Sequence, residues 1–483
     1  MMTSRQAAGR SHRWRGRLAS LIVASTMVTV LQADAAPGTF RLDFYFTGGP
    51  QEEIYSLDRV VAEPLPWPGP PPARLDPFDY GVYRVDIEDS AGHVTFRRGF
   101  SPLFWEWTTT AEARDRSRTF HESVRFPEPA EPVTVLFSKR DERGNFEEVW
   151  RVAVDPADPY VDRAVPPRLE VLELERHGEP TNKVDLLLLG DGYTSDECAS
   201  KFRADAERMR TALFRLDPFR ERRDDFNVWG LCPPSPESGI SRPSTGIHRA
   251  SPVGTTYDIF GAERYVLTYD NRSLRNIAAR APHDYIVILA NAETYGGGGL
   301  YNVYATVTVD NDFADYLFVH EFAHHFAALA DEYYTSPLVY EPPEEIFEPW
   351  EPNVTTLPNA TALKWRDLLT PGVPLPTPWP KEAYEEYMRD VQARRIAIRE
   401  QELPEEAMSA LFREEQQASS RMLGSAEFAG AVGAFQGANY DAEAYFRPQI
   451  DCVMFTRNEV PFCRVCERVL SKVIDFYTSL PSD

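Results

Sequence analysis

Positive charge is scarce in this sequence of 483 residues, in which 51 Lys and Arg face 74 Asp and Glu, a net charge of -23. Outside its first twenty residues, the chain has no basic surface that could neutralise a phosphate backbone. We therefore expect no nucleic-acid partner. With 43% hydrophobic residues, the chain is long enough for two or three domains, each with its own buried core.

Long apolar runs are also missing after residue 36, so no later segment is a candidate transmembrane helix. Residues 1–35 differ from the rest: a basic stretch, RQAAGRSHRWRGR, precedes the apolar stretch LASLIVASTMVTVL and the small residues Ala33–Ala35. This order predicts a signal peptide with cleavage near Ala35, and a membrane anchor is the alternative. No cysteine stands at the cleavage point, which argues against a lipoprotein. We expect a secreted or periplasmic protein without stable membrane insertion after signal cleavage.

Cysteine is rare, with five residues in the whole chain. Cys452, Cys463 and Cys466 lie close together near the end, and Cys198 and Cys232 lie far upstream. CRVC by itself could belong to a zinc knuckle, but such a site needs a second pair of ligands and none follows. Because export favours oxidation, we predict a disulfide from Cys452 to Cys463 or to Cys466, and one thiol stays unassigned.

Several catalytic signatures are absent as well. There is no G-x-S-x-G elbow, and the cysteines lack the local signatures of thiol proteases. YGGGGLYN, at Tyr295–Asn302, lacks the Gly-Lys-Ser/Thr of a phosphate-binding loop. GDGYT, at Gly190–Thr194, follows a buried strand, and there we predict that Asp191 caps the next helix, with a calcium site as the alternative.

The hydrophobic pattern divides the chain into two regions. Residues 37–160 contain short segments in which apolar and polar residues alternate, and these predict an all-β sandwich domain. The segments are FRLDFYF, YGVYRVDIED, HVTFRRGF, PVTVLFSKR and FEEVWRVAVD. In residues 166–483, strands such as VDLLLLGD and YIVILA alternate with helical segments, which predicts an α/β domain with a mixed sheet. Residues 381–422 are charge-rich and helical, and we expect them to form an inserted arm of two solvated helices.

The densest group of chemically active residues is FVHEFAHHFAALADEYY, at Phe318–Tyr334. Residues four apart lie on one face of a helix, so His320 and His324 can bind one Zn²⁺ ion through their imidazole nitrogens. Glu321 lies about 100° further round the helix, where it flanks the ion and can take a proton from water. The spacing therefore predicts a zinc site with Glu321 as the catalytic base.

A catalytic zinc site needs a third protein ligand, and Asp331 and Glu332 are the nearby carboxylates. On a straight helix Asp331 would lie about 10 Å beyond His324, too far to reach the same ion. We therefore predict that the helix ends between Ala327 and Ala330 and that the chain folds back. Asp331 is the preferred ligand and Glu332 the alternative, whereas His325 points elsewhere and is expected to pack or to support the site.

The zinc motif HEFAHHFAALADEYY resembles that of the IgA peptidase family of secreted bacterial metallopeptidases, which is related to the metzincins. Further stretches resemble that family in the same order, and they cover nearly all of the mature chain: SLDRVVAEPLPWPG, LLLLGDGYT, FNVWGLCPPSPESGI, NAETYGGGGLYNVYATVTVD, EPWEPNVT and VGAFQGANYDAEAYFRPQIDCVMFTRNEVPFC.

The resemblance implies a zincin-like catalytic domain, a turn at Met454 beneath the zinc ligands, and substrate pairing along the strand YATVTVD. Relatives carry glycines after the histidines where this chain has Ala323, Ala327 and Ala328.

Together, these features predict a secreted zinc endopeptidase that hydrolyses a protein or peptide substrate, with an accessory N-terminal domain. One alternative is an exported binding or adhesion protein on an inactive metalloprotease scaffold. Another is a zinc amidase that acts on a non-protein amide. The family name does not transfer a substrate, because specificity resides in the site and not in the fold.

Overall fold

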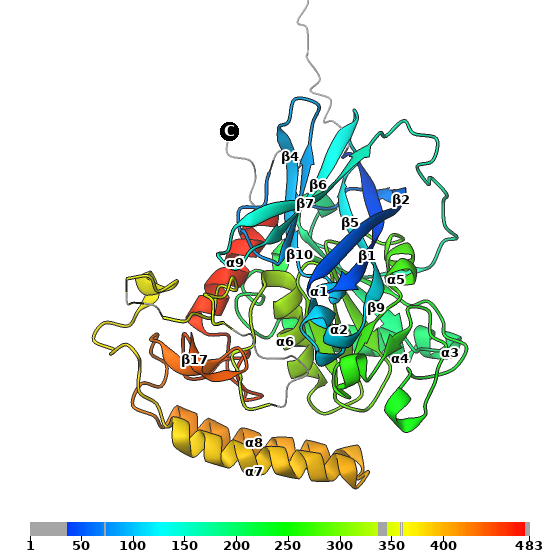
Figure 1. The fold of residues 1–483 in the computed structure, drawn as a ribbon. Coiled ribbons are helices and arrows are strands. Elements are labelled where there is room, and N and C mark those ends of the chain that lie inside the picture. Colours follow the sequence, from blue (N-terminus) through cyan, green and yellow to red (C-terminus); the bar gives the residue numbers. More distant parts are fainter. Residues whose placement is uncertain (1–35, 72–73, 337–344, 358, 360, 479–483) are drawn as a thin grey trace, which may run out of the picture. The chain divides into compact units, whose positions relative to one another are not determined.

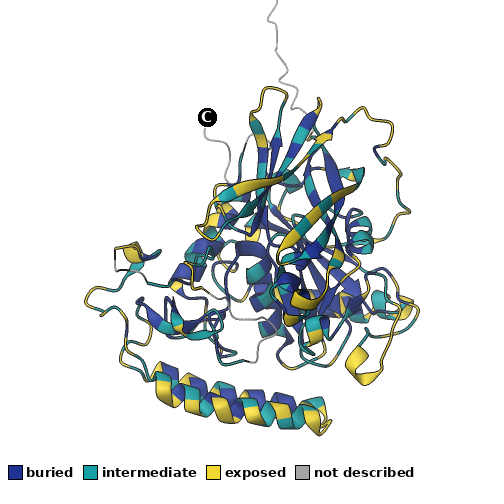
Figure 2. Ribbon diagram, viewed as in Figure 1, coloured by how far each residue is buried: buried dark blue, intermediate teal, exposed yellow. Residues whose placement is uncertain are grey.

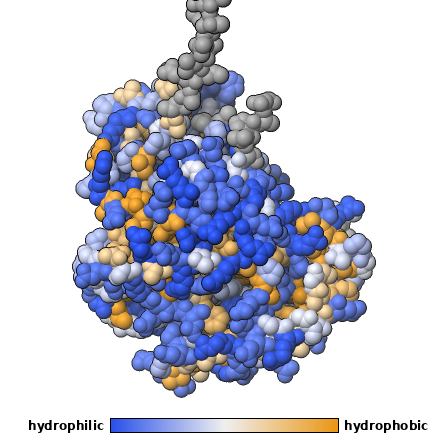
Figure 3. Space-filling model, turned by 180° about the vertical axis from the view of Figure 1, so that it is seen from behind, coloured by the Kyte–Doolittle hydropathy of each residue, from blue (hydrophilic) through white to orange (hydrophobic). Residues whose placement is uncertain are grey.

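A computed structural model of the chain describes residues 36–71, 74–336, 345–357, 359 and 361–478 (Figure 1). The predicted signal peptide, residues 1–35, lies outside the described residues. Within the described residues, no helix has the length and apolar character needed to cross a membrane. Hydrophilic residues cover most of the face shown in Figure 3, as the charge-rich composition requires.

The N-terminal region is rich in β-structure and forms two antiparallel sheets, with strand orders β2-β1-β5 and β4-β3-β6-β7. Aromatic residues of the two sheets meet in one core, where the rings of Phe44 and Phe137 lie 5.0 Å apart. The bounds are β1 (Gly38–Gly49), β2 (Glu52–Pro66), β3 (Tyr83–Glu88), β4 (Val94–Phe100), α1 (Leu103–Thr108), α2 (Ala111–Asp115), β5 (Arg118–Pro127), β6 (Val133–Arg140) and β7 (Phe146–Val154).

The second region is built on a six-stranded mixed sheet of order β14-β15-β13-β9-β10-β8. The four inner strands are parallel, and the edge strands β14 and β8 are antiparallel to their neighbours. The strands are β8 (Val171–Glu175), β9 (Val184–Asp191), β10 (Phe226–Leu231), β13 (Tyr285–Ala290), β14 (Gly297–Leu300) and β15 (Tyr304–Thr308). The predicted mixed sheet with helices, preceded by a β-rich region, is therefore confirmed.

Most of the helices cover one face of this sheet, and the N-terminal sheets with one short helix cover the other, which explains why β9 is buried along its whole length. Leu186 and Leu188 belong to the core formed with α4, α6 and α9. The alternate residues Leu187 and Leu189 belong to the core formed with the N-terminal sheets and α5. The helices are α3 (Ser195–Ala199), α4 (Lys201–Leu213), α5 (Asn271–Ala278), α6 (Ala314–Ala327), α7 (Lys381–Glu400), α8 (Glu405–Gly424) and α9 (Arg464–Thr478).

The N-terminal sheets thus share a hydrophobic core with the central sheet, and residues 36–483 form one compact unit. The division into domains at 37–160 and 166–483 stays a prediction. Two short antiparallel pairs complete the strands, β11 (Thr255–Thr256) with β12 (Leu267–Thr268), and β16 (Phe435–Ala438) with β17 (Asp441–Arg447).

The predicted helical arm consists of α7 and α8, which begins directly after Pro404. The expectation of two solvated helices is wrong for one face of this pair. Figure 2 shows a buried stripe along both helices, and Tyr384, Met388, Leu411 and Phe412 pack into the core that contains α6. Most of the charged residues therefore occupy the outward face of the arm, whereas Glu415 is buried and pairs with Arg457.

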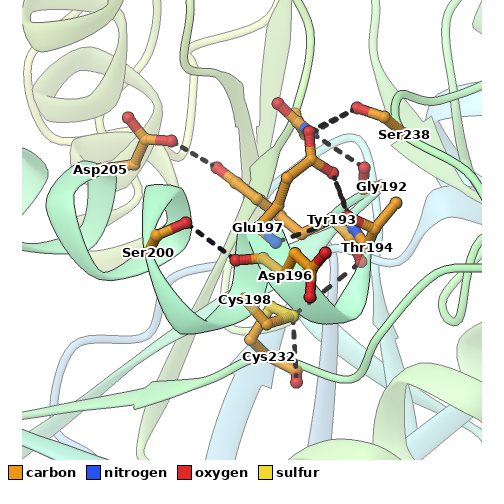
Figure 4. Close-up of a disulfide and its surroundings, with 11 residues drawn as sticks. Gly192, Tyr193, Thr194, Asp196, Glu197, Cys198, Ser200, Asp205, Cys232 and Ser238 are labelled. Carbon is orange, nitrogen blue, oxygen red and sulfur yellow. Dashed lines mark hydrogen bonds between the residues drawn. A yellow bond between two sulfur atoms is a disulfide. The ribbon is translucent and has the colours of Figure 1, made fainter.

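The turn after β9 corrects the predicted role of Asp191. Its buried carboxylate accepts hydrogen bonds from the Ser251 hydroxyl and from the backbone amides of Val253 and Thr255. Thr194 caps α3 instead, in a reciprocal pair with Glu197 that Figure 4 shows. Asp191 therefore fixes a distant loop and not the start of the next helix.

The cysteine pairing also differs from the prediction. A disulfide joins Cys198 to Cys232 (Figure 4). Cys452, Cys463 and Cys466 form no disulfide, so the predicted bond from Cys452 is wrong. Cys198 and Cys232 follow two adjacent parallel strands, β9 and β10, whose carboxyl ends lie together. The spacing of the two cysteines in the sequence does not indicate that they are close in space.

A carboxyl group buried at the start of β9 is expected to make the stability of the protein depend on pH. Asp185 is fully buried, and its Oδ1 atom accepts hydrogen bonds from Asn227 and Trp229 while Oδ2 has no partner. Burial, and then repulsion by Asp284, raises the pKa of the Asp185 carboxyl. The folded state therefore binds a proton more tightly than the unfolded state. The resulting stability is fully present below the unfolded pKa of about 3.9 and is lost as the pH rises through the raised folded pKa.

We predict that the stabilisation by Asp185→Asn, measured as the free energy of unfolding, is about 2 kcal/mol larger at about pH 8 than at about pH 5, because the wild type loses stability between these pH values. Urea unfolding at both pH values measures this difference. Asp115→Asn, a change at the exposed end of α2, is the control and should show no such dependence. Equal effects of Asp185→Asn at the two pH values would contradict the proposed titration.

Candidate metal centre

Helix α6 carries the two histidines on one face and orients both rings through backbone carbonyls. Nδ1 of His320 lies 3.1 Å from the Val453 carbonyl oxygen, and Nδ1 of His324 lies close to the Leu329 carbonyl oxygen. Each Nδ1–H is therefore a donor, which leaves the Nε2 lone pairs as the exposed ligand atoms. These two Nε2 atoms are 3.1 Å apart.

The helix ends at Ala327, and Ala328 adopts the left-handed conformation with φ 56° and ψ 31°. Its amide donates to the His324 carbonyl, so the last turn closes before the chain reverses. Asn353 then holds Ala330 through two hydrogen bonds, one to its amide and one to its carbonyl. The structure thus places the reversal inside the predicted interval and returns Asp331 to the histidines.

Three side chains converge at this point. Oδ1 of Asp331 lies 2.9 Å from Nε2 of His320 and 3.2 Å from Nε2 of His324. Ligand atoms of a tetrahedral zinc ion with nitrogen and oxygen ligands are about 3.3 Å apart, so this triangle fits such an ion. The three side chains are 5%, 14% and 8% exposed for His320, His324 and Asp331, which leaves one open side.

The electrostatics of the triangle favour a bound cation. Burial works against an ionised carboxylate, but His324 and His320 hold the pKa of Asp331 well below its usual range. Burial likewise opposes protonation of His324, yet the Asp331 carboxylate raises the pKa of that ring to about 9. A divalent metal ion could take the place of the proton on His324, because it would bind the Asp331 carboxylate and both imidazoles at once.

Glu332 and His325, the neighbours of these residues, point away from the triangle. The Glu332 carboxylate is fully buried and accepts a hydrogen bond from Asn353. Nε2 of His325 accepts from the Ile286 amide and its Nδ1 donates to Leu300, while burial lowers the pKa of the ring to about 3. His325 therefore joins α6 to the sheet as a neutral ring, and Glu332 is not placed to share an ion with the two histidines.

The turn that contains Met454 lies directly against α6. The Val453 carbonyl accepts from His320 and from the Tyr316 hydroxyl, and the Met454 carbonyl accepts from the Glu332 amide at 2.8 Å. Met454 itself is fully buried. The turn therefore supports both the first histidine and the segment that returns Asp331.

Tyr440 also belongs to the candidate site, although the sequence analysis assigned it no role. It occupies the tight turn of the β16–β17 hairpin, where Asn439 and Tyr440 have φ values of 47° and 64°. Its hydroxyl donates to Oδ2 of Asp331, and its amide donates to the Tyr333 carbonyl. The only local sign in the sequence is ANYD, a turn-forming sequence between two short strands, and it does not show what the turn will meet.

Glu321 lies beside the triangle in a cavity of about 220 Å³. The same cavity is lined by the three converging side chains and by Arg264, Tyr440 and Trp105. Burial raises the pKa of the Glu321 carboxyl, and the positive charge of the two histidines opposes that rise. A carboxylate with a raised pKa is a stronger base, which suits a group that takes a proton from water.

The glycine run before α6 forms the edge strand β14, which lies almost in contact with the helix. A Cβ atom on Gly299 would stand 2.4 Å from the Glu321 carbonyl oxygen and 2.8 Å from Cβ of His324, so only glycine fits there. Strand β15, which contains most of YATVTVD, is paired on both sides by β14 and β13. The expectation that YATVTVD pairs with a substrate is therefore wrong, because its backbone is already used within the sheet.

Comparison with known proteins assigns the chain to a family. The model described as IgA Peptidase M64 matches residues 172–474. A second model, described as Peptidase M64 N-terminus, matches residues 32–151. No curated protein gives a significant match.

The left-handed residue at the helix end yields a stability prediction. An alanine in this conformation is strained and a glycine is not, so Ala328→Gly should raise the free energy of unfolding by about 0.5–1 kcal/mol. Its neighbour Ala327 is helical, and Ala327→Gly should lower that free energy by about 1 kcal/mol. Thermal and urea unfolding of the two variants measure the contrast, and a loss of stability in both would contradict the assigned backbone conformation.

Proposed function

Because the chain belongs to the IgA peptidase M64 family, and is thus a peptidase, we propose that it is a secreted zinc-dependent endopeptidase with a zincin-like catalytic region. One observation carries the proposal: Nε2 of His320, Nε2 of His324 and the Asp331 carboxylate meet within 3.2 Å of one another beside Glu321. These three residues would hold the Zn²⁺ ion, and Glu321 would be the catalytic residue.

When bound, zinc supplies Lewis acidity, which lowers the pKa of water and polarises a carbonyl group. Glu321 takes the proton of the attacking water and then delivers it to the nitrogen of the leaving amine. The carbonyls of Val453 and Leu329 keep the histidine rings in one tautomer and orientation. Tyr440 orients Asp331 by donating to the oxygen that the histidines do not contact.

The cavity supports a peptide substrate that makes contacts on more than one side of the reacting bond. Trp105 and Glu106 of α1 line it from the N-terminal region, and Tyr384 and Met388 of α7 line it from the helical pair. This shared lining supports an endopeptidase and gives the N-terminal region a part in substrate binding. A protein or peptide is therefore the proposed partner.

Two features support secretion. The sequence of residues 1–35 has the order of a signal peptide. The disulfide between Cys198 and Cys232 is typical of proteins that fold in an oxidising compartment. Sequencing the N-terminus of the exported protein tests this part of the proposal, with cleavage expected near Ala35.

We predict that Glu321→Gln lowers kcat on a denatured protein substrate by about 10²–10⁴-fold and leaves bound zinc unchanged, because the amide cannot accept the proton. Elemental analysis and the release of new amino termini measure the two quantities. Glu386→Gln, on the exposed face of α7, is the matched control and should keep full activity. Full activity of Glu321→Gln would refute the assignment of Glu321 as the base. A wild-type protein that binds zinc but cleaves no protein substrate would favour an amidase.

We predict that Trp105→Ala raises KM for long peptides by about tenfold, with little change for short ones, because the indole lines the cavity away from the reacting groups. Val149→Ala, at an exposed position on β7, is the control from the same region and should leave KM unchanged. An equal effect of Trp105→Ala on short and long peptides would contradict a role in extended substrate binding.

A further inference from the structure

A second group of metal-binding side chains lies in the core, next to the metal centre but separate from it. Glu332, Cys452, Cys463 and Cys466 place one ligand atom each within 4.8 Å of one another. All four residues are buried, and Glu332, Cys452 and Cys466 are fully so. Glu332 comes from the segment after α6, and the three cysteines come from one stretch near the end of the chain, at the turn before Met454 and at the start of α9.

The distances within this group fit a tetrahedral ion. Sγ of Cys452 lies 4.0 Å from Sγ of Cys466, and Oε1 of Glu332 lies 3.3 Å from Sγ of Cys466 and 3.9 Å from Sγ of Cys463. Around a zinc ion, two sulfur ligands are about 3.8 Å apart, and a sulfur and a carboxylate oxygen about 3.6 Å apart. The Sγ atoms of Cys452 and Cys466 are about twice as far apart as the sulfurs of a disulfide. A disulfide within the group would also leave one of the three thiols without a role.

The remaining polar atoms around the group also indicate an ion. Oε2 of Glu332 is buried and has no hydrogen-bond partner, so the carboxylate is incompletely satisfied by its neighbours. The amide of Cys463 donates to Sγ of Cys452, and the amide of Cys466 donates to Sγ of Cys463. Backbone donors of this kind stabilise thiolates, which are the form of cysteine that binds metals.

The position of Glu332 explains how two sites can share one short segment. Residues 328–334 form no helix after α6 ends, and Asp331 and its neighbour Glu332 point in opposite directions, one to the histidines and one to the thiols. The buried guanidinium of Arg447 interacts with Glu332 and offsets part of the negative charge that three thiolates and a carboxylate would bring.

We propose that Glu332, Cys452, Cys463 and Cys466 bind a second zinc ion, with a structural role. Three thiolates favour zinc over hard cations, and four protein ligands leave no open position for substrate. The ion would join the start of α9, the turn before Met454 and the segment that carries Asp331. It would thereby fix the third ligand of the first site without taking part in the reaction.

Metal content and thiolate ligation test the proposal on the full mature chain. We expect two zinc ions in the wild type, one in the double variant His320→Ala/His324→Ala, and one in Cys463→Ser. After exchange into Co²⁺, the wild type and the double histidine variant should both show sulfur-to-cobalt charge-transfer absorption, and Cys463→Ser should show a strong reduction. The control Cys198→Ser/Cys232→Ser removes the disulfide outside the group and should keep two ions.

The wild type alone decides the question if Cys463→Ser does not fold. Alkylation of the denatured, unreduced protein in the presence of a chelator should modify three cysteines. If a disulfide formed within the group, only one cysteine would be modified. Absence of sulfur-to-cobalt absorption from the wild type overturns the proposal, whatever the thiol count. Failure of the proposed peptidase site is distinguishable, because it would abolish the ion that depends on the histidines and leave the thiolate absorption intact.

Discussion

The contact between the Asp331 carboxylate and the Nε2 atoms of His320 and His324 is the interaction on which the site depends. It joins side chains that a continuous helix would separate by about 10 Å. It exists because α6 stops at Ala327 and Ala328 takes a left-handed conformation that turns the chain back. The geometry of the candidate metal centre is therefore set by a backbone reversal as much as by the residues that line it.

The segment after the reversal has no regular secondary structure of its own, so neighbouring elements must hold it in place. Asn353 binds Ala330, the Met454 carbonyl binds the Glu332 amide, and the β16–β17 turn binds Asp331 and Tyr333. These contacts come from three separate stretches of chain. The proposed thiolate site would add a further restraint, from the side opposite the histidines. A site held in this way keeps its ligands fixed while substrate enters, which is what preorganisation requires.

The layered core explains how the helix itself is fixed. The alternate residues of β9 pack against α6 on one face of the sheet and against the N-terminal sheets on the other. The edge strand β14 lies so close to α6 that glycine is required at Gly299. The N-terminal region is therefore part of the same packed structure as the site, and its Trp105 and Glu106 reach the cavity. This arrangement places residues of the β-rich region beside the candidate site.

The sequence predicted the features that depend on local spacing. Residues four apart place His320 and His324 on one face, Glu321 follows from the motif, and the alternation of residues predicted most of the N-terminal strands. Strands β2 and β5 were missed, although β5 alternates buried and less buried residues as an antiparallel strand should. The predicted helix end was close to the observed one, because Asp331 could reach the histidines only if the helix stopped before it.

Contacts between distant segments were decided only by the tertiary structure. The disulfide between Cys198 and Cys232, the loop contacts of Asp191, the buried face of the α7–α8 pair and the bond from Tyr440 to Asp331 all join residues far apart in the chain. CRVC lacked a second ligand pair in the sequence, yet the fold brings Cys452 and Glu332 beside it. The sequence by itself determined which side chains one helix presents together. Which of them meet a partner from another element depends on packing, because side-chain proximity across elements has no counterpart in sequence spacing.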